Sequence, residues 1–208
     1  MIKHIPNALT MMRVLAIPFF VYSAINNLPI LATTIFILAC ITDYFDGMLA
    51  RKYNVITNFG KLMDPLADKF LVLAALVVLC IDPINYIHWS VMVIILVREV
   101  AVTVLRHIYQ MKNIVIPADK LGKIKTTVQM IGIIFALIFY TVVQYIEPLL
   151  TVSEYFLKIF IYQENIIYYI QIYFWIVAAI TIWSGVNYFY RGASHRGIPE
   201  QSGSVKPL

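Results

Sequence analysis

Residues 43–68 read DYFDGMLARKYNVITNFGKLMDPLAD and join two long apolar runs, with aspartates at both ends of the connection. Asp43 and Asp46 lie three residues apart at the end of the first run. Asp64 and Asp68 lie four residues apart at the start of the second. On a helix, each spacing puts both carboxylates on one face. The connection is short, so the sequence predicts two antiparallel neighbouring helices whose carboxylates meet.

The residues around these aspartates favour a divalent metal and a phosphate ligand. Carboxylates gathered in a low-dielectric cleft repel one another unless they are protonated or share cations. The stretch contains no His or Cys, and a site built from oxygen ligands suits Mg²⁺ or Mn²⁺. Gly47, Ala50 and Gly60 leave room for a large ligand, and Arg51 adds a positive charge suited to phosphate.

A simpler interpretation treats the aspartates as ordinary helix-end charges in contact with water. Asp64 would then cap the second helix, with Pro65 at its first position. This interpretation accounts for one aspartate and leaves the two same-face pairs unexplained. We therefore favour the metal site.

The composition indicates an all-α integral membrane protein. Of the 208 residues, 61% are hydrophobic and 13% are charged, whereas soluble domains have about 45–50% apolar and about 25% charged residues. We expect one transmembrane catalytic domain over residues 1–191, beginning with a surface segment at 1–8, and a cytoplasmic tail at 192–208. The six predicted transmembrane helices cover residues 9–25, 29–51, 64–81, 87–108, 121–146 and 166–190. Residues 149–162 are expected to form a separate amphipathic helix on the outer surface.

The distribution of basic residues predicts the orientation. With the N terminus inside, all of the 16 Lys and Arg residues except Lys158 fall on the inner side or at inner helix ends. Such an excess marks the cytoplasmic face. Both termini are therefore predicted to be cytoplasmic. We read the net charge of +5 as a sign of topology and contact with anionic lipid rather than of nucleic-acid binding.

A second cluster of charged residues follows in the later helices and is basic. Arg98 lies too deep in its helix to anchor a loop, and the start of the fifth helix adds its dipole to two lysines. We predict that these residues bind a second phosphate; the predicted set is Arg98, Arg106, Lys123 and Lys125. The alternative is that the lysines only anchor the helix at the inner surface. Near the N terminus, the possible contacts with the site recur every three residues and are Asn7, Thr10 and Arg13.

The stretch at 43–68 resembles the signature of the CDP-alcohol phosphatidyltransferase family, D-x2-D-G-x2-A-R-x8-G-x3-D-x3-D. All fixed positions match, and they are Asp43, Asp46, Gly47, Ala50, Arg51, Gly60, Asp64 and Asp68. The resemblance implies six transmembrane helices, a homodimer and a site with two metal ions. It implies that Asp43, Asp46 and Asp64 hold metal, and that Asp68 completes the metal site and acts as general base. The implied CDP-binding residues are Asp43, Gly47, Ala50, Arg51 and Gly60.

Within the family, the chain resembles bacterial members that use CDP-diacylglycerol as donor and glycerol 3-phosphate as acceptor. The resemblance lies in IPNALTMMR at 5–13, DPLADK at 64–69, Arg98-Glu99 and GKIKT at 122–126. It implies release of CMP, a place in phospholipid biosynthesis, and an active site on the cytoplasmic side of the bacterial inner membrane. Serine, inositol phosphate or a second lipid remain alternative acceptors.

Two other classes of function were considered. A divalent-cation transporter would spread its carboxylates through the depth of the bilayer, whereas these cluster near one face beside Arg51. An inactive scaffold would not need an intact motif. Both alternatives are less favoured than the transferase.

Overall fold

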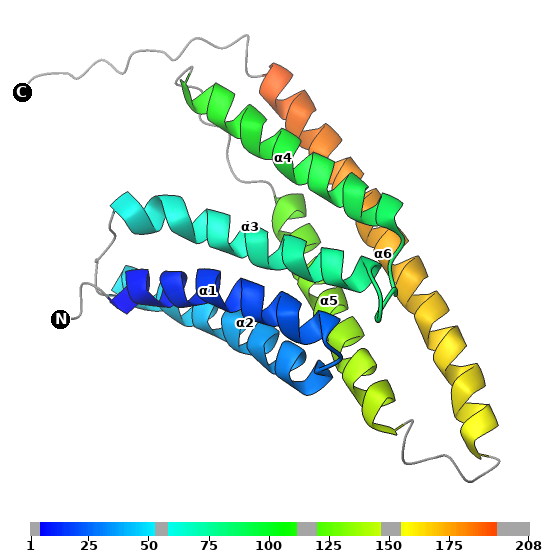
Figure 1. The fold of residues 1–208 in the computed structure, drawn as a ribbon. Helices are drawn as coiled ribbons and strands as arrows, with labels where there is room; N and C mark the ends of the chain where they lie inside the picture. Colours follow the sequence, from blue (N-terminus) through cyan, green and yellow to red (C-terminus); the bar gives the residue numbers. More distant parts are fainter. Residues whose placement is uncertain (1–4, 53–57, 112–119, 147–154, 195–208) are drawn as a thin grey trace, which may run out of the picture.

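The chain is all-helical over the residues that a computed structural model describes, which are 5–52, 58–111, 120–146 and 155–194. Six helices follow one another along this part of the chain (Figure 1). They are α1 (Ile5–Ile25), α2 (Pro29–Lys52), α3 (Asn58–Cys80), α4 (Trp89–Met111), α5 (Lys120–Ile146) and α6 (Tyr155–Ser194). Each predicted transmembrane segment corresponds to one of them.

Two predicted boundaries were wrong. α3 begins at Asn58, six residues before the expected start, so Asp64 lies inside the helix and does not cap it. Pro65 is compatible with a first helical position, but here the preceding residues extend the helix. α6 runs without interruption from Tyr155, so residues 155–162 are not a separate surface helix. The residues between the two predicted helices, Gln163-Glu164-Asn165, include no Gly or Pro to stop a helix. Residues 149–154 lie outside the described residues.

A tight turn at Asn27 folds α2 back along α1. Asn27 has a φ of 55°, a left-handed conformation that Asn tolerates better than most residues. Pro29 then begins α2, a position that suits its fixed φ and missing N–H. The Tyr140 hydroxyl of α5 donates to Asn27 Oδ1 at 2.9 Å, which ties this turn to a distant part of the chain.

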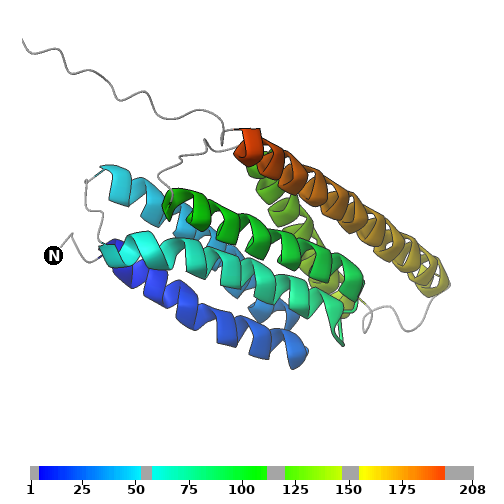
Figure 2. The same ribbon diagram turned by 90° about the horizontal axis from the view of Figure 1, so that it is seen from above.

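The helices form two groups of three (Figures 1 and 2). α1 packs against both α2 and α3, whereas α6 packs against both α4 and α5. The groups meet where α2 contacts α5 and where α3 contacts α4 and α5. Functional side chains of the first group can therefore face those of the second across this boundary.

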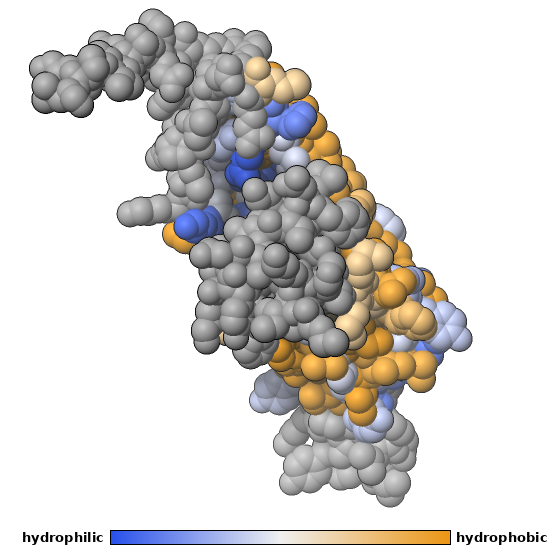
Figure 3. All heavy atoms as spheres, turned by 90° about the vertical axis from the view of Figure 1, so that its left-hand side faces the viewer, coloured by the Kyte–Doolittle hydropathy of each residue, from blue (hydrophilic) through white to orange (hydrophobic). Residues whose placement is uncertain are grey.

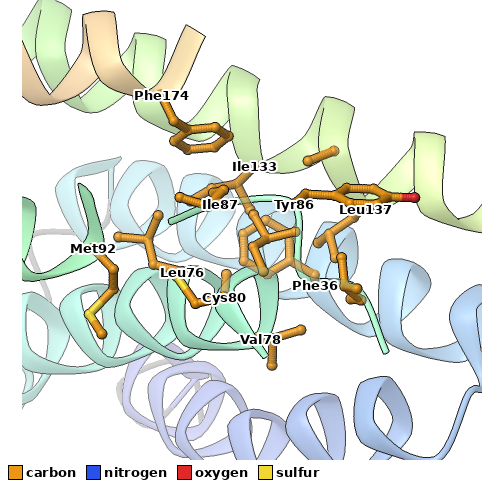
Figure 4. Packing of buried hydrophobic residues seen from close by; sticks show 14 of the residues in the cluster. Phe36, Leu76, Val78, Cys80, Tyr86, Ile87, Met92, Ile133, Leu137 and Phe174 are labelled. Atoms are coloured by element: carbon orange, nitrogen blue, oxygen red, sulfur yellow. The ribbon is translucent and has the colours of Figure 1, made fainter. Parts of the chain in front are cut away.

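A buried apolar cluster fills the boundary between the groups (Figure 4). Phe36 of α2, Leu76 of α3, Ile133 of α5 and Phe174 of α6 are each at most 1% exposed. Burying such a side chain stabilises the fold by about 1.5–3 kcal/mol. The cluster thus fixes the relative positions of the helices that carry the polar residues described below.

The surface is apolar over much of its area. Figure 3 shows hydrophilic surface gathered toward the upper ends of α4 and α6 as drawn in Figure 1, and largely hydrophobic described surface farther down. Two stretches of the described helices are long and apolar enough to cross a bilayer, Gly122–Tyr145 and Tyr162–Tyr190. Shorter apolar helices span Thr10–Ile25 and Pro29–Asp43.

Candidate active site

An ion pair between α1 and α2 fixes the first aspartate. Arg13 Nη1 lies 2.6 Å from Asp43 Oδ1, which is a close ion-pair contact. The Arg13 side chain is fully buried, whereas that of Asp43 is 43% exposed. Arg13 therefore holds Asp43 from the protein side while leaving carboxylate surface open to a ligand. The sequence predicted possible contacts with the site from Asn7, Thr10 and Arg13. Thr10 and Arg13 are both buried, and the side chain of Asn7 lies outside those that the structure describes.

Asp68 of α3 belongs to the same polar region. Its carboxyl group interacts electrostatically with Asp43 and Arg13 of the first helix group, with its neighbour Lys69, and with Glu99 of α4. Asp68 therefore lies at the boundary between the two helix groups, within range of both predicted clusters.

The other signature residues belong to α2 and α3, but their side chains lie outside those that the structure describes; they are Asp46, Gly47, Ala50, Arg51, Gly60 and Asp64. Among the described side chains no group of three or more His, Cys, Asp or Glu could hold a metal ion, and this set lacks two of the four aspartates. The two aspartates that are described do supply accessible oxygen donors, the ligand type that Mg²⁺ and Mn²⁺ prefer. Their chemistry fits a divalent metal.

Glu99 is the centre of the basic cluster. Its Oε1 accepts hydrogen bonds from Lys125 Nζ of α5 and from Arg98 Nη1, the latter at 3.1 Å. The Arg98 guanidinium also donates from Nη2 to Ser184 Oγ of α6 at 2.7 Å. One carboxylate thus joins the cations of α4 and α5, and Arg98 extends the network to α6.

Two further contacts border this network. Lys69, the neighbour of Asp68, donates from Nζ to Thr103 Oγ1 of α4. The guanidinium carbon of Arg106 lies 5.8 Å from the centre of the Tyr188 ring of α6, within the range of a cation–π contact. The first contact joins α3 to α4, and the second joins α4 to α6.

The structure brings together part of the predicted second site. Arg98 and Lys125 share Glu99, and Arg106 lies eight residues along α4 from Arg98. Lys123 is exposed near the start of α5, and its side chain is not part of the Glu99 network. Arg98 of α4 and Lys125 of α5 are therefore linked through Glu99. Arg106 lies farther along α4, and Lys123 lies at the surface of α5.

A comparison with models of known protein families identifies the family of this chain. The model of the CDP-alcohol phosphatidyltransferase family matches residues 3–186. The chain belongs to the CDP-alcohol phosphatidyltransferase family. The match includes every aspartate and basic residue discussed above. The chain is therefore a transferase of this family of membrane enzymes, as its signature predicted.

Curated relatives within the family carry closely related names. A CDP-diacylglycerol–glycerol-3-phosphate 3-phosphatidyltransferase of Rickettsia bellii is 36% identical over 90% of this chain and 94% of its own length. The protein of the same name in Mycoplasma pneumoniae is 36% identical over 64% of this chain and 67% of its own. A probable phosphatidylglycerophosphate synthase of Mycobacterium tuberculosis is 41% identical over 64% of this chain and 65% of its own.

The sequence did not reveal that α6 contacts the arginines of α4 in this phosphatidyltransferase-family chain. Ser184 and Tyr188 contact the arginines of α4, and neither was singled out. A signal was present, since Thr181, Ser184 and Gly185 recur at helical spacing inside an otherwise apolar segment. Small polar residues at such a spacing are also common where transmembrane helices merely pack, so the pattern alone does not identify a site.

We expect Arg13→Met to lower CMP release by at least about tenfold, because catalytic groups must be held within about 0.5 Å of their working positions. Without the guanidinium, Asp43 loses the contact that orients its carboxylate. The assay is CMP release by purified protein in detergent, with folding checked by thermal unfolding. Met12→Ala serves as the matched control, since Met12 is 64% exposed. Full activity of a folded Arg13→Met protein would contradict the role of the ion pair.

Proposed function

We propose that the chain acts as a phosphatidylglycerophosphate synthase, which transfers the phosphatidyl group from CDP-diacylglycerol to glycerol 3-phosphate and releases CMP. The observation that carries this proposal is the cluster of cations around Glu99, next to Asp68. The names of the relatives agree with it. The proposed place of the reaction is the biosynthesis of phosphatidylglycerol and the lipids made from it.

The charge of the cluster favours a phosphorylated acceptor. Arg98, Lys125 and Lys69 all act on Glu99, and Asp68 adds a second carboxylate beside Lys69. With Arg106 farther along α4, four cations and two carboxylates leave a surplus of positive charge. A phosphate monoester carries about −1.5 to −2 charges at neutral pH, which matches that surplus. Serine has no phosphate to neutralise it, whereas inositol phosphate has one, so the charge argues against serine and the substrate panel below separates the two phosphorylated acceptors. The acceptor phosphate is therefore proposed to bind Arg98 and Lys125, with Arg106 and Lys123 nearer the entrance.

The donor is proposed to bind at the aspartates of α2 and α3. Two divalent ions, Mg²⁺ or Mn²⁺, held by Asp43, Asp46, Asp64 and Asp68 would neutralise charge on the diphosphate. Gly47, Ala50, Arg51 and Gly60 are proposed to line the CDP pocket. The acceptor hydroxyl gives its proton to Asp68, its oxygen bonds to the phosphorus that carries diacylglycerol, and the bond from that phosphorus to CMP breaks. Such a transfer depends mainly on positioning and charge stabilisation, and these residues supply both.

The proposal includes the placement of the protein in the membrane. All six helices span the bacterial inner membrane, both termini are cytoplasmic, and the site opens to the cytoplasm, where glycerol 3-phosphate is available. The excess of basic residues on one side supports this orientation. The protein is further proposed to be a homodimer, which light scattering of the detergent-solubilised protein tests.

The acceptor is tested by a panel of substrates. Purified protein is supplied with CDP-diacylglycerol and Mg²⁺ or Mn²⁺, and CMP release is measured with glycerol 3-phosphate, glycerol, serine, inositol phosphate or no acceptor. We expect metal-dependent release with glycerol 3-phosphate alone. Release with serine or inositol phosphate instead would retain the family and reject the proposed acceptor. Glycerol is the control for the phosphate, because it differs from the expected substrate only in lacking that group.

The general base is tested by Asp68→Asn, which keeps the shape of the side chain and removes its ability to take a proton. Because general base catalysis contributes about 10²–10⁴-fold and Asp68 is also proposed to hold metal, we expect CMP release to fall by at least about 10²-fold. Thermal unfolding should show a folded protein. A variant with near-normal activity would reject Asp68 as the base.

The orientation is tested by labelling single cysteines. Cys40 and Cys80 are first replaced by Ala, and cysteine is introduced at Ser204 or at Lys158. We expect a membrane-impermeant maleimide to label intact cells only through Lys158→Cys, and permeabilised cells through both, because the tail is proposed to be cytoplasmic. Labelling of Ser204→Cys in intact cells would reverse the proposed topology.

A further inference from the structure

One face of α6 carries polar residues in the part of the helix that packs against α4. Thr181, Ser184, Gly185 and Tyr188 are spaced so that they share a helix face. Thr181 and Ser184 are at most 1% exposed and Tyr188 is 3% exposed. Small polar residues at this spacing also occur where transmembrane helices merely pack, so the case for a role in the site depends on what these residues contact.

Ser184 and Gly185 hold the Arg98 side chain from two sides. Ser184 Oγ accepts the hydrogen bond from Arg98 Nη2 at 2.7 Å. A Cβ added at Gly185 would lie 3.1 Å from Arg98 Cγ and 3.5 Å from its Nε. The first of these distances is tighter than about nine in ten real contacts of this kind, so the arginine stem would have to shift by a few tenths of an ångström. A side chain at position 185 therefore presses on the part of Arg98 that carries the guanidinium.

Arg98 and the same face of α6 also carry unpartnered polar atoms. Arg98 Nε, Thr181 Oγ1 and the Tyr188 hydroxyl are buried and have no hydrogen-bond partner within the part of the chain that the structure describes. Native proteins leave few buried polar groups unpaired, and each calls for an explanation such as a bound ligand. The same α6 face also carries Tyr188 against Arg106. Both arginines proposed to bind the acceptor thus rest on α6.

We propose that Ser184 and Gly185 are positioning residues for the acceptor, acting through Arg98. Ser184 fixes the direction of the guanidinium, and the missing side chain at Gly185 gives its stem room to lie against α6. The inference rests on the proposed function, since the ligand of Arg98 is taken to be the phosphate of glycerol 3-phosphate. It adds α6 as the third wall of that site, beside Arg98 of α4 and Lys125 of α5.

The competing explanation is plain helix packing, because Gly and Ser allow transmembrane helices to approach closely. The two explanations predict different kinetics. A packing defect lowers stability and affects both substrates alike. A displaced Arg98 weakens binding of the acceptor and leaves the lipid donor unaffected.

The test compares Gly185→Ala and Ser184→Ala with wild type, measuring KM for glycerol 3-phosphate and for CDP-diacylglycerol by CMP release. We expect KM for glycerol 3-phosphate to rise about tenfold in Ser184→Ala, since the lost hydrogen bond is to a charged group. A rise of about threefold to tenfold is expected in Gly185→Ala, because small misplacements of a binding group have large kinetic effects. KM for CDP-diacylglycerol should stay within about twofold of wild type, as binding that does not involve Arg98 is unchanged.

Gly132→Ala is the packing control. A Cβ there would lie 2.3 Å from Tyr173 Cε1, in the interface of α5 with α6 but against a different side chain. It should lower the unfolding temperature without changing the ratio of the two KM values. The Arg98→Ala background adds a second check: Gly185→Ala should have no further effect there, because the side chain that it displaces is gone.

The possible outcomes distinguish failure of the positioning role from failure of the proposed synthase activity. Wild-type CMP release that does not depend on glycerol 3-phosphate would overturn both. Dependence on glycerol 3-phosphate with unchanged KM in both α6 variants would overturn the positioning role alone. Parallel changes in both KM values, or an undiminished effect of Gly185→Ala in the Arg98→Ala background, would assign Ser184 and Gly185 to packing.

Discussion

The charges buried among apolar helices need partners within the protein, and the Glu99 carboxylate meets that requirement for three cations. It accepts hydrogen bonds from Lys125 and Arg98 and interacts electrostatically with Lys69. Its side chain is 30% exposed, so solvent shares in balancing these charges. Glu99 thus links α4 to Lys125 of α5 while leaving a positively charged region between the two helices. The rest of the proposed acceptor site depends on this arrangement.

The two groups of helices divide the chemistry between them. The first group, α1 to α3, carries Asp43 and Asp68, and the second, α4 to α6, carries the cluster around Glu99. Lys69 of α3 donates to Thr103 of α4, so the groups are joined beside Asp68 itself. A reaction between a lipid-bound diphosphate and a water-soluble phosphate needs two anion sites that do not merge. In the proposed function, the two helix groups would each supply one of these sites, and the apolar cluster at the boundary holds the groups in place.

Much of this organisation could be predicted from the sequence, and the reasons are local. Long apolar runs must be helices in lipid, and the spacing of Asp43 to Asp68 is too regular to arise from ordinary helix ends. What could not be predicted depended on contacts across the fold. Glu99 was noticed beside Arg98, but its bond to Lys125 joins residues 26 positions apart, and the contact of Arg98 with Ser184 joins residues 86 apart. The start of α3 at Asn58 was missed because Pro65 suits a helix start and gives no sign that the helix already exists.

The use of Gly185 rather than a larger residue follows from the depth of Arg98. An arginine near the middle of α4 cannot reach water directly, so its long side chain must lie along a neighbouring helix to present its charge at the site. Contact with Gly185 allows the stem to lie flat against α6, and Ser184 then fixes the guanidinium without adding a second charge. An acidic residue in place of Ser184 would neutralise Arg98 and remove the positive surplus that favours a phosphate. In the proposed positioning role, a neutral hydroxyl orients the cation and leaves its charge available to a substrate.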